Sequence, residues 1–411
     1  MRKKILFYSD CEIFGGSERM LPILMNDEYF RNNFDIHFSY RNTVAYEEGL
    51  VHRIEPGVKV TKLSILDPDY LHHLSFFRSL RISQVQGIFV RLMRLPIFLH
   101  DLFVLTKFMK KVNPELIHIN NGGYPGALSC RAAVVAAKFC RIKVITMVVN
   151  NITVDYNSIG RRLQLPLDKF VSRNVSLFIT GSRYASAQLE RVLGLEKSRT
   201  RSIWNGVRVP SAHEMNASPS LERIAYPTAD FVVGMVAQLV PRKGLLVAIE
   251  AAAKFVEDNS LVRGEFVLLI EGSGPLEAEI RRMISIRKLE HFVVLVGIVE
   301  DIFTFINSID AMLLTSISNE DLPNVISEAM AFCKPVIASH LAGIPEQIRS
   351  GENGILCSPG DVEAFSNALN KLRMSPKLRE DFGRKGGEFY NKQFSPEVSA
   401  SKYKLEYDSL L

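Results

Sequence analysis

Cysteine is scarce in this chain of 411 residues, and none of its cysteines forms a CxxC pair. The five are Cys11, Cys130, Cys140, Cys333 and Cys357, an odd number that leaves one over in any pairing scheme. We therefore expect neither a disulfide framework nor a structural zinc site, and a reducing compartment fits this usage best.

Long hydrophobic runs are also missing. No stretch of about 18 uninterrupted apolar residues occurs, so we expect no membrane span. The basic N-terminus has an apolar run only from Ile5 to Tyr8, which is too short for a signal peptide and typical of a first strand. Hydrophobic residues at 47% and charged residues at 23% indicate a soluble globular protein, and the length predicts two or three domains. We expect a cytoplasmic protein.

Charge is distributed unevenly along the chain. Residues 1–208 carry 30 Lys and Arg against 17 Asp and Glu, whereas residues 209–411 carry 20 against 27. The basic half is expected to face an anionic partner. Nucleic acid is disfavoured because no nucleic-acid-binding motif accompanies the charge, which leaves a membrane or a phosphorylated acceptor.

The basic character is strongest in residues 76–111. This segment has one acid, Asp101, and seven cations: Arg78, Arg81, Arg91, Arg94, Lys107, Lys110 and Lys111. The interleaved apolar residues are Phe76, Phe77, Phe89, Leu92, Phe98, Leu99 and Phe103. Such a composition is typical of a helix lying on an anionic membrane, which would make the protein peripheral on the inner face of the plasma membrane. The alternative is an ordinary helix that packs on a sheet while its cations are solvated.

Short β-branched and apolar runs alternate with longer amphipathic stretches in both halves. In the first half they are Lys4–Tyr8, Ile36–Tyr40, Leu116–Ile119, Val144–Val149 and Leu177–Thr180. In the second half they are Phe231–Ala237, Phe266–Ile270, Phe292–Val296, Ala311–Thr315, Val336–Ser339 and Gly354–Cys357. Continuous apolar runs predict parallel strands covered by helices on both faces, and hence two doubly wound, Rossmann-like α/β domains.

The domain boundary is predicted from a change in composition. The stretch Pro210–Asp230 is rich in Ser, Ala, Pro and Glu, and a new strand opens at Phe231. We therefore predict an N-terminal domain over 1–208 and a C-terminal domain over 209–390. Residues 391–411 are predicted to form a helix that packs back toward the N-terminal domain.

Ligands in open parallel sheets bind beyond the carboxyl ends of the strands, so the residues after each strand are the candidates. Gly15 and Gly16 follow the first strand and would let the backbone approach a phosphate or sugar, although an ordinary tight turn is the alternative. His118 lies inside a later strand and Asn120 at its exit. A core histidine that meets no ligand is the alternative for His118.

The second half offers a cation and two carboxylates. Lys243 follows the first strand of this half, next to a helix start, where it could neutralise phosphate, although a solvated surface lysine is the alternative. The stretch Ser316–Pro335 follows a buried strand and is predicted to open a helix near Pro323, whose first amides could bind a diphosphate. Glu320 precedes that helix and Glu328 lies one turn inside it, so the two can reach different hydroxyls of one ligand.

Together these features resemble the glycosyltransferases of family 4, which are retaining enzymes of the GT-B fold. The best element is the E-x7-E motif from Glu320 to Glu328, followed by Lys334-Pro335. Supporting matches, in order, are Asn205-Gly206-Val207, Arg242-Lys243-Gly244, Gly272-Ser273-Gly274-Pro275 and Gly343-Ile344-Pro345-Glu346. The resemblance runs over nearly the whole chain and is strongest from Phe231 to Leu372. It implies two domains that face each other across a cleft, an acceptor-binding N-terminal domain and a nucleotide-sugar-binding C-terminal domain.

The resemblance assigns roles to the candidate residues. Glu328 would bind the ribose hydroxyls of the donor, Glu320 the donor sugar or its diphosphate end, and Lys243 the leaving diphosphate. Gly15 and Gly16 would close over the diphosphate, and further donor contacts are expected from Arg242, Gln238, Asn324 and Val325. The catalytic set is then Glu320, Lys243, Asn120 and His118, with no cofactor and no metal ion.

Three positions depart from the family pattern. Ala237-Gln238 replaces a Gly-Arg pair that usually supplies a second phosphate cation, unless Arg242 substitutes for it. His118-Ile119-Asn120 replaces a His-x-His, and Cys333 replaces the glycine before Lys-Pro.

The expected activity is transfer of a sugar from a UDP- or GDP-linked donor to a glycan or lipid-linked acceptor, in cell-surface polysaccharide or lipopolysaccharide synthesis. The first two departures also allow a second interpretation, in which the protein is a non-catalytic sensor or scaffold that binds the sugar nucleotide on the same fold. A Rossmann oxidoreductase is disfavoured, because no GxGxxG with an acid about 20 residues on is present.

Overall fold

The computed structural model describes residues 2–66, 83–210 and 229–411, except for the side chains of residues 83–91. Phe76, Phe77, Arg78 and Arg81 of the basic segment, and most of the stretch Pro210–Asp230, lie outside the described residues. The chain divides into two compact units. The first comprises residues 1–204 together with 399–411, and the second comprises residues 205–398.

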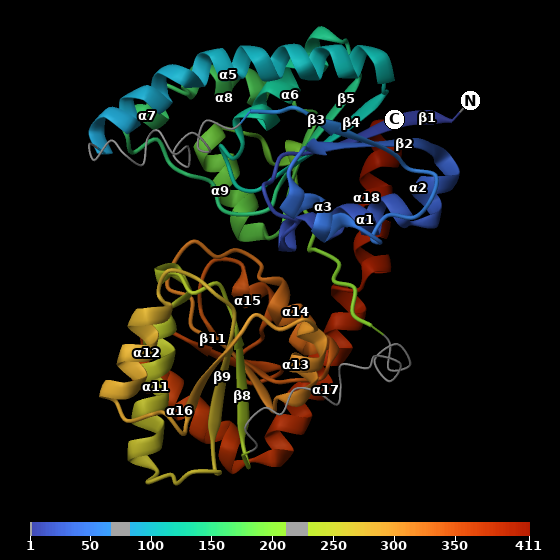
Figure 1. The fold of residues 1–411 in the computed structure, drawn as a ribbon. Helices are drawn as coiled ribbons and strands as arrows, with labels where there is room; N and C mark the ends of the chain where they lie inside the picture. Colours follow the sequence, from blue (N-terminus) through green and yellow to red (C-terminus); the bar gives the residue numbers. More distant parts are fainter. Residues whose placement is uncertain (1, 67–82, 211–228) are drawn as a thin grey trace. The chain divides into compact units, whose positions relative to one another are not determined.

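The first unit is built on a seven-stranded parallel sheet in the order β3-β2-β1-β4-β5-β6-β7 (Figure 1). The strands are β1 (Lys3–Ser9), β2 (Phe34–Arg41), β3 (Lys59–Leu63), β4 (Leu116–Asn121), β5 (Val144–Val149), β6 (Leu177–Thr180) and β7 (Thr200–Ser202). Its central strands are buried on both faces, which explains their continuous apolar sequences.

Helices cover both faces of this sheet. They are α1 (Met20–Asn26), α2 (Glu28–Asn33), α3 (Val44–Leu50), α5 (Ser83–Val112), α6 (Leu128–Phe139), α7 (Ile159–Arg162), α8 (Leu165–Asn174) and α9 (Arg183–Leu193). Helices α5 and α6 pack on one face and α1, α2 and α3 on the other, each against its own hydrophobic cluster. The unit is therefore a doubly wound α/β layer structure, as predicted.

The second unit has a six-stranded parallel sheet in the order β10-β9-β8-β11-β12-β13. Its strands are β8 (Val232–Val236), β9 (Val267–Glu271), β10 (Val293–Gly297), β11 (Ala311–Leu314), β12 (Val336–Ser339) and β13 (Gly354–Cys357). Its helices are α11 (Leu245–Asp258), α12 (Glu277–Ile286), α13 (Ile302–Ser308), α14 (Asn324–Ala331), α15 (Ile344–Gln347), α16 (Val362–Met374) and α17 (Pro376–Gln393). The prediction of a second doubly wound domain is confirmed.

All of the predicted strands are present, but two strands among the described residues were missed. Strand β3 lies at one edge of the first sheet and most of its residues are not buried, so it carries no continuous apolar run. Strand β7 lies at the opposite edge and has only three residues. Edge strands are covered on fewer sides than central ones, so their sequences are a weaker signal.

In each sheet the strand order reverses once. The reversal lies between β1 and β4 in the first unit and between β8 and β11 in the second. At such a switch point the two neighbouring loops leave in opposite directions and open a crevice at the carboxyl ends of the strands. The residues that follow β1, β4, β8 and β11 are therefore the ones placed for ligands.

The C-terminal helix α18 (Pro396–Leu410) belongs to the first unit from Ser399 onward. Ala400, Tyr403 and Tyr407 are buried in the cluster that lies beneath β1 and β2. Tyr407 packs edge-on against Phe30, with ring centroids 5.8 Å apart. The last residues of the chain therefore complete a core that begins with its first strand.

Candidate active site

Lys243 and Glu320 meet at the switch point of the second unit. Lys243 ends the short 3-10 helix after β8, and Glu320 lies in the loop after β11. The ammonium group of Lys243 donates to Oε2 of Glu320, and the hydroxyl of Ser316 donates to the same oxygen at 3.0 Å. Both charged side chains are about nine-tenths buried, so each neutralises the other.

Backbone packing holds these two loops together. Gly244 has a φ of 66°, and a Cβ atom there would lie 1.9 Å from the carbonyl oxygen of Thr315. The hydroxyl of Thr315 donates to the carbonyl of Gly244 at 2.8 Å, and the amide of Ile317 donates to the carbonyl of Arg242 at 2.9 Å. The glycine after Lys243 is thus required by the close approach of the two loops.

Two further predicted donor residues lie in the segment between β8 and α11, which also carries Lys243. Arg242 is one-third exposed, and its guanidinium approaches Oε2 of Glu320 at 3.5 Å while donating to the carbonyl of Asn319 at 3.3 Å. Gln238 is exposed in the loop after β8. The site therefore has two cations near Glu320, although the position of the usual family arginine is taken by an amide.

Helix α14 carries the second carboxylate of the E-x7-E motif. Asn324 and Val325 form its first turn and are half-buried, while Glu328 in its second turn is buried. Pro323 caps this helix instead of forming its first residue, so the helix begins one residue later than expected. The amide of Gln347 donates to the carbonyl of Pro323 at 3.1 Å and to Ser327 at 2.9 Å, which ties the helix start to α15.

Sequence reasoning missed Glu271, which ends β9. Its carboxylate accepts from the amide of Val299 at 3.4 Å. Burial raises the pKa of the Glu271 carboxyl, the hydrogen bond from Val299 lowers it, and the nearby Glu328 carboxylate raises it further. Glu271 and Glu328 are thus acidic neighbours. The sequence does not show this, because the two residues lie far apart along the chain.

The glycine pair of the first unit lies in the loop after β1. Gly15 has a φ of −98°, and an added Cβ would meet nothing closer than 4.0 Å. Any residue could adopt that conformation, so the turn itself does not require glycine at position 15. A missing side chain at this place leaves the backbone accessible to a ligand, which is the role predicted for Gly15 and Gly16.

Glu18, which follows the glycine pair, is the centre of a buried hydrogen-bond network. It accepts from Ser9 at 2.7 Å, from the hydroxyl of Tyr46 at 2.6 Å and from the amide of Asn120 at 2.8 Å. Burial raises the pKa of the Glu18 carboxyl, and the three hydrogen bonds oppose that shift. Asn120, predicted as catalytic, is buried and holds Glu18 with its amide nitrogen.

His118 is a core residue of the first unit. Its side chain is 1% exposed, lies 4.9 Å from the ring of Phe7 and is hydrogen-bonded through Nδ1 to the hydroxyl of Tyr407. Burial lowers the pKa of His118 to about 3, so the imidazole is neutral at physiological pH. These contacts are those of the core histidine that the sequence left as the alternative to a catalytic role.

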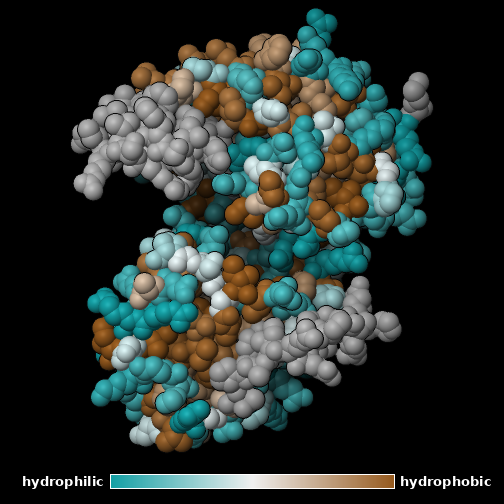
Figure 2. Space-filling model, viewed as in Figure 1, coloured by the Kyte–Doolittle hydropathy of each residue, from teal (hydrophilic) through white to brown (hydrophobic). Residues whose placement is uncertain are grey.

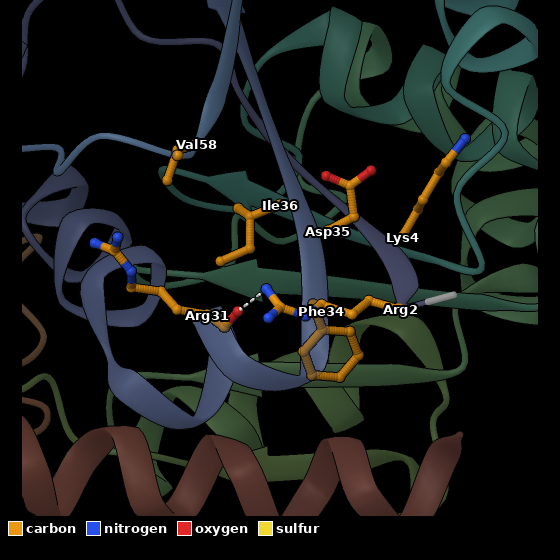
Figure 3. Close-up of a pocket in the computed structure, with 8 residues that line it drawn as sticks. Arg2, Lys4, Arg31, Phe34, Asp35, Ile36 and Val58 are labelled. Atoms are coloured by element: carbon orange, nitrogen blue, oxygen red, sulfur yellow. Dashed lines mark hydrogen bonds between the residues drawn. The ribbon is translucent and has the colours of Figure 1, made fainter.

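A cavity of about 390 Å³ opens at the other end of the first sheet, where β1 and β2 begin (Figure 3). Arg2, Lys4, Arg31 and Asp35 line it. Arg2 donates to the carbonyl of Arg31 at 2.8 Å, and the ammonium group of Lys4 donates to the carbonyl of Val112 at 3.0 Å. Because the cavity lies at the amino ends of the strands, it is separate from the switch point and its candidate residues.

Helix α5 contains the described part of the basic segment. Its inward side chains Ile97, Leu105 and Met109 are buried. Its outer face carries Leu92, Leu95, Leu99 and Phe103, which are between 55% and 69% exposed and recur at helical spacing. Figure 2 shows hydrophobic residues gathered along this helix. A helix whose outer side only meets water does not require an apolar outer face. On α5 this face is followed by three cations, Lys107, Lys110 and Lys111.

Two features are absent from the described ranges, 2–66, 83–210 and 229–411. No helix there is both long and apolar enough to cross a membrane. No three His, Cys, Asp or Glu side chains there gather in the manner of a metal site. The five cysteines are free thiols.

The sequence matches two families of known proteins. Residues 63–209 match the family described as Glycosyltransferase Family 4, and residues 220–389 match Glycosyl transferases group 1. The chain belongs to glycosyltransferase family 4. The two matches follow one another along the chain, the first lying mainly in the first unit and the second in the second unit.

Curated relatives of this glycosyltransferase are between 26% and 37% identical to it over the parts that align. An uncharacterized glycosyltransferase of Methanocaldococcus jannaschii is 26% identical over 302 residues, which cover 73% of this chain and 77% of the relative. A lipopolysaccharide core biosynthesis glycosyltransferase of Rhizobium meliloti is 29% identical over 172 residues, 42% of this chain and 48% of the relative. The chain thus spans less than half the length of the second relative.

Solved structures share the fold of this glycosyltransferase over its whole length. The HepE protein of Anabaena, crystallised in complex with UDP, superposes with a TM-score of 0.74 at 19% identity and covers 99% of this chain and 100% of its own. A likeness at this identity shows the fold, so the predicted GT-B architecture of two Rossmann-like units is confirmed.

Proposed function

We propose that the protein is a retaining glycosyltransferase that moves a sugar from a nucleoside-diphosphate sugar to a glycan or lipid-linked acceptor, in cell-surface polysaccharide or lipopolysaccharide synthesis. The observation that carries the proposal is the Lys243–Glu320 pair at the switch point of the second unit. The lipopolysaccharide relative from Rhizobium meliloti supports the class of acceptor.

The donor's diphosphate would bind at this pair. A diphosphate carries more negative charge than one carboxylate, so it would replace Glu320 as the partner of Lys243. Glu320 would then accept hydrogen bonds from hydroxyls of the donor sugar, and Arg242 would add a second cation to the phosphate. As the anomeric carbon becomes oxocarbenium-like, negative charge grows on the diphosphate, and the two cations stabilise that charge.

The other donor contacts follow from the position of α14. Glu328 would accept from the ribose hydroxyls, and the amides of Asn324 and Val325 would bind a phosphate at the start of that helix. Gln238 would lie at the edge of the donor, and Gly15 and Gly16 would contact the diphosphate through their backbone. Since Lys243 and Arg242 supply positive charge, the proposed transfer requires no metal ion.

The acceptor side involves the first unit and an anionic membrane. The exposed apolar face of α5 would enter the interface between lipid headgroups and chains, and Lys107, Lys110 and Lys111 would face the anionic headgroups. This arrangement would keep the protein peripheral on the inner face of the plasma membrane, where a lipid-linked acceptor is found.

A thermal-shift panel of UDP, GDP, ADP and CMP tests the donor site, each nucleotide with magnesium and with EDTA. A ligand at about 100 times its dissociation constant stabilises a folded protein by about 2.7 kcal/mol. We expect one nucleoside diphosphate to stabilise the wild type equally with and without metal, and Glu328→Ala to lose that shift. Glu290→Ala, an exposed acid before β10, is the matched control.

A hydrolysis assay with the sugar nucleotide of the base found in that panel separates the enzyme from the sensor. Hydrolysis of the matching sugar nucleotide supports the transferase, whereas binding without any turnover supports the sensor. The replacement of Gly-Arg by Ala237-Gln238 is the observation that favours the sensor. Binding that requires magnesium would contradict the metal-free proposal.

Vesicle sedimentation tests the membrane contact. We expect the protein to bind vesicles with 30 mol% anionic lipid, about a third of the total, through α5. The double variant Leu99→Glu and Phe103→Glu should abolish binding, whereas Ile286→Glu, an exposed apolar position on α12, should not. Binding that survives the double variant would rule out the outer face of α5 as the contact.

A further inference from the structure

A chain of hydrogen bonds crosses the switch point of the first unit. It runs from Glu18, after β1, to Asn120 at the end of β4 and on to Asn150 after β5. The amide nitrogen of Asn120 donates to Oε1 of Glu18 at 2.8 Å, and the amide nitrogen of Asn150 donates to Oδ1 of Asn120 at 2.8 Å. Sequence reasoning noted Asn120 but missed Asn150 and the role of Glu18.

The direction of this chain is determined by the chemistry of Glu18. Both carboxylate oxygens of Glu18 accept hydrogen bonds, so Asn120 must turn its nitrogen toward Glu18 and its oxygen toward Asn150. Asn150 must then turn its own nitrogen inward, where it also donates to the carbonyl of Asn121 at 3.1 Å. Each amide thus has one orientation that satisfies its neighbours.

The consequence is a hydrogen-bond acceptor at the carboxyl end of β5. Both amide hydrogens of Asn150 are used inside the unit, and its Oδ1 has no hydrogen-bond partner within the part of the chain that the structure describes. Asn150 is half-buried, so this oxygen is not shielded like Asn120. A group that binds there must donate a hydrogen bond, as the hydroxyls of sugars do.

We propose that Asn150 accepts a hydrogen bond from a hydroxyl of a bound sugar, and that Glu18 and Asn120 are positioning residues that fix the orientation of its amide. This inference rests on the proposed function, since the sugar is that of the donor or of the glycan acceptor. The two sources share one chemistry and are distinguished by assay.

Kinetic measurements with Asn150→Ala test the contact. The donors are UDP-glucose, UDP-galactose, UDP-N-acetylglucosamine and GDP-mannose, and the acceptor probes are octyl β-glucoside and octyl β-galactoside. Loss of one neutral hydrogen bond should lower kcat/KM by up to about tenfold. The affinity for UDP alone should stay within about twofold, because UDP has no sugar hydroxyl to offer.

The donor sugar and the acceptor sugar are distinguished by which of the two rates falls. Slower hydrolysis of the donor in water assigns the hydroxyl to the donor sugar, and slower transfer to the octyl glycoside with unchanged hydrolysis assigns it to the acceptor. Unchanged rates in both assays overturn the inference. Asn174→Ala is the control, since that amide only donates to the carbonyl of Phe170 at the end of α8.

Stability measurements test the fixed orientation without any turnover. Asn150→Asp places a second oxygen against the oxygens of Asn120 and Asn121, so it should melt at a lower temperature than Asn150→Ala. The amide of Glu18→Gln can donate a hydrogen bond to Asn120, so the side-chain amide of Asn120 can reverse its orientation. The difference in melting temperature between the two Asn150 variants should therefore shrink in the Glu18→Gln background. Equal melting temperatures for the two Asn150 variants in both backgrounds would overturn the role of Glu18.

A wild type that hydrolyses none of the four donors contradicts the proposed transferase activity, and the stability comparison still decides the orientation of the amides. The two failures are therefore distinguishable.

Discussion

The ammonium group of Lys243 donates to the carboxylate of Glu320, which lies 77 residues further along the chain. The two residues come from loops on the two sides of a switch point, after β8 and after β11. Both side chains are largely buried, and each is the other's nearest oppositely charged group. This relationship is the basis of the first prediction.

Replacing Lys243 by Ala should slow turnover of the donor sugar nucleotide by about a hundredfold, because charge that develops on the diphosphate would lose its main cation. Steady-state kinetics of donor hydrolysis measure the effect. Lys254→Ala, which removes an exposed cation paired with Asp258 on α11, should leave the rate unchanged. Equal rates for both variants would contradict the role of Lys243.

Gly244→Ala should destabilise the second unit and weaken nucleotide binding. Position 244 combines a φ of 66° with a Cβ that would lie 1.9 Å from the carbonyl oxygen of Thr315. Gly360→Ala is the matched control, because its φ is 81° but its Cβ would meet no atom within 4 Å. The clash should cost about 1–3 kcal/mol beyond the backbone strain that both variants share. Chemical denaturation and UDP titration of the two variants measure the difference.

Cys333→Gly should be more stable than Cys333→Ala by about 1 kcal/mol, because Cys333 has a φ of 53°, in the left-handed region that favours glycine. Both variants lose the thiol, so their difference reports backbone strain alone. Thermal unfolding measures it. Two equal melting temperatures would mean that the surrounding loop relaxes to accommodate a side chain at this position.

His118→Gln should flatten the acid dependence of stability. The pKa of His118 is lowered by burial to about 3, from an ordinary value near 6.5. Between these pH values the unfolded chain binds a proton at this position and the folded chain does not. Above pH 6.5 the titration of His118 therefore does not reduce the free energy of unfolding. Below that pH the free energy of unfolding falls by up to about 1.4 kcal/mol per pH unit.

Comparing urea unfolding of the wild type and His118→Gln at pH 7 and pH 5 isolates this contribution. The wild type should lose more stability over that range than the variant does. Equal losses would mean that the pKa of His118 is the same in the folded and unfolded states, which would contradict the lowering by burial.

Much of the fold was predictable because its signals are local. A buried parallel strand is apolar along its whole length, so Val144–Val149 and Val336–Ser339 were recognised from their own sequence. The edge strands β3 and β7 were missed because partial cover leaves no such signal. The E-x7-E spacing was recognisable because Glu320 and Glu328 lie within one loop and the helix that follows it.

The tertiary structure decided which residues meet. His118 and Tyr407 are 289 residues apart, and only the return of α18 to the first unit makes His118 a core residue. In the same way, Asn150 became part of a site only because β5 lies beside β4.

The sequence by itself therefore determined the strands, the switch from strand to helix and the residues at the strand ends, since these depend on periodicity and local backbone preference. The order of the strands in each sheet decided the rest. It brings Lys243 to Glu320 and Asn150 to Asn120, because contacts between distant segments depend on which hydrophobic faces pack together, and no local pattern encodes that choice.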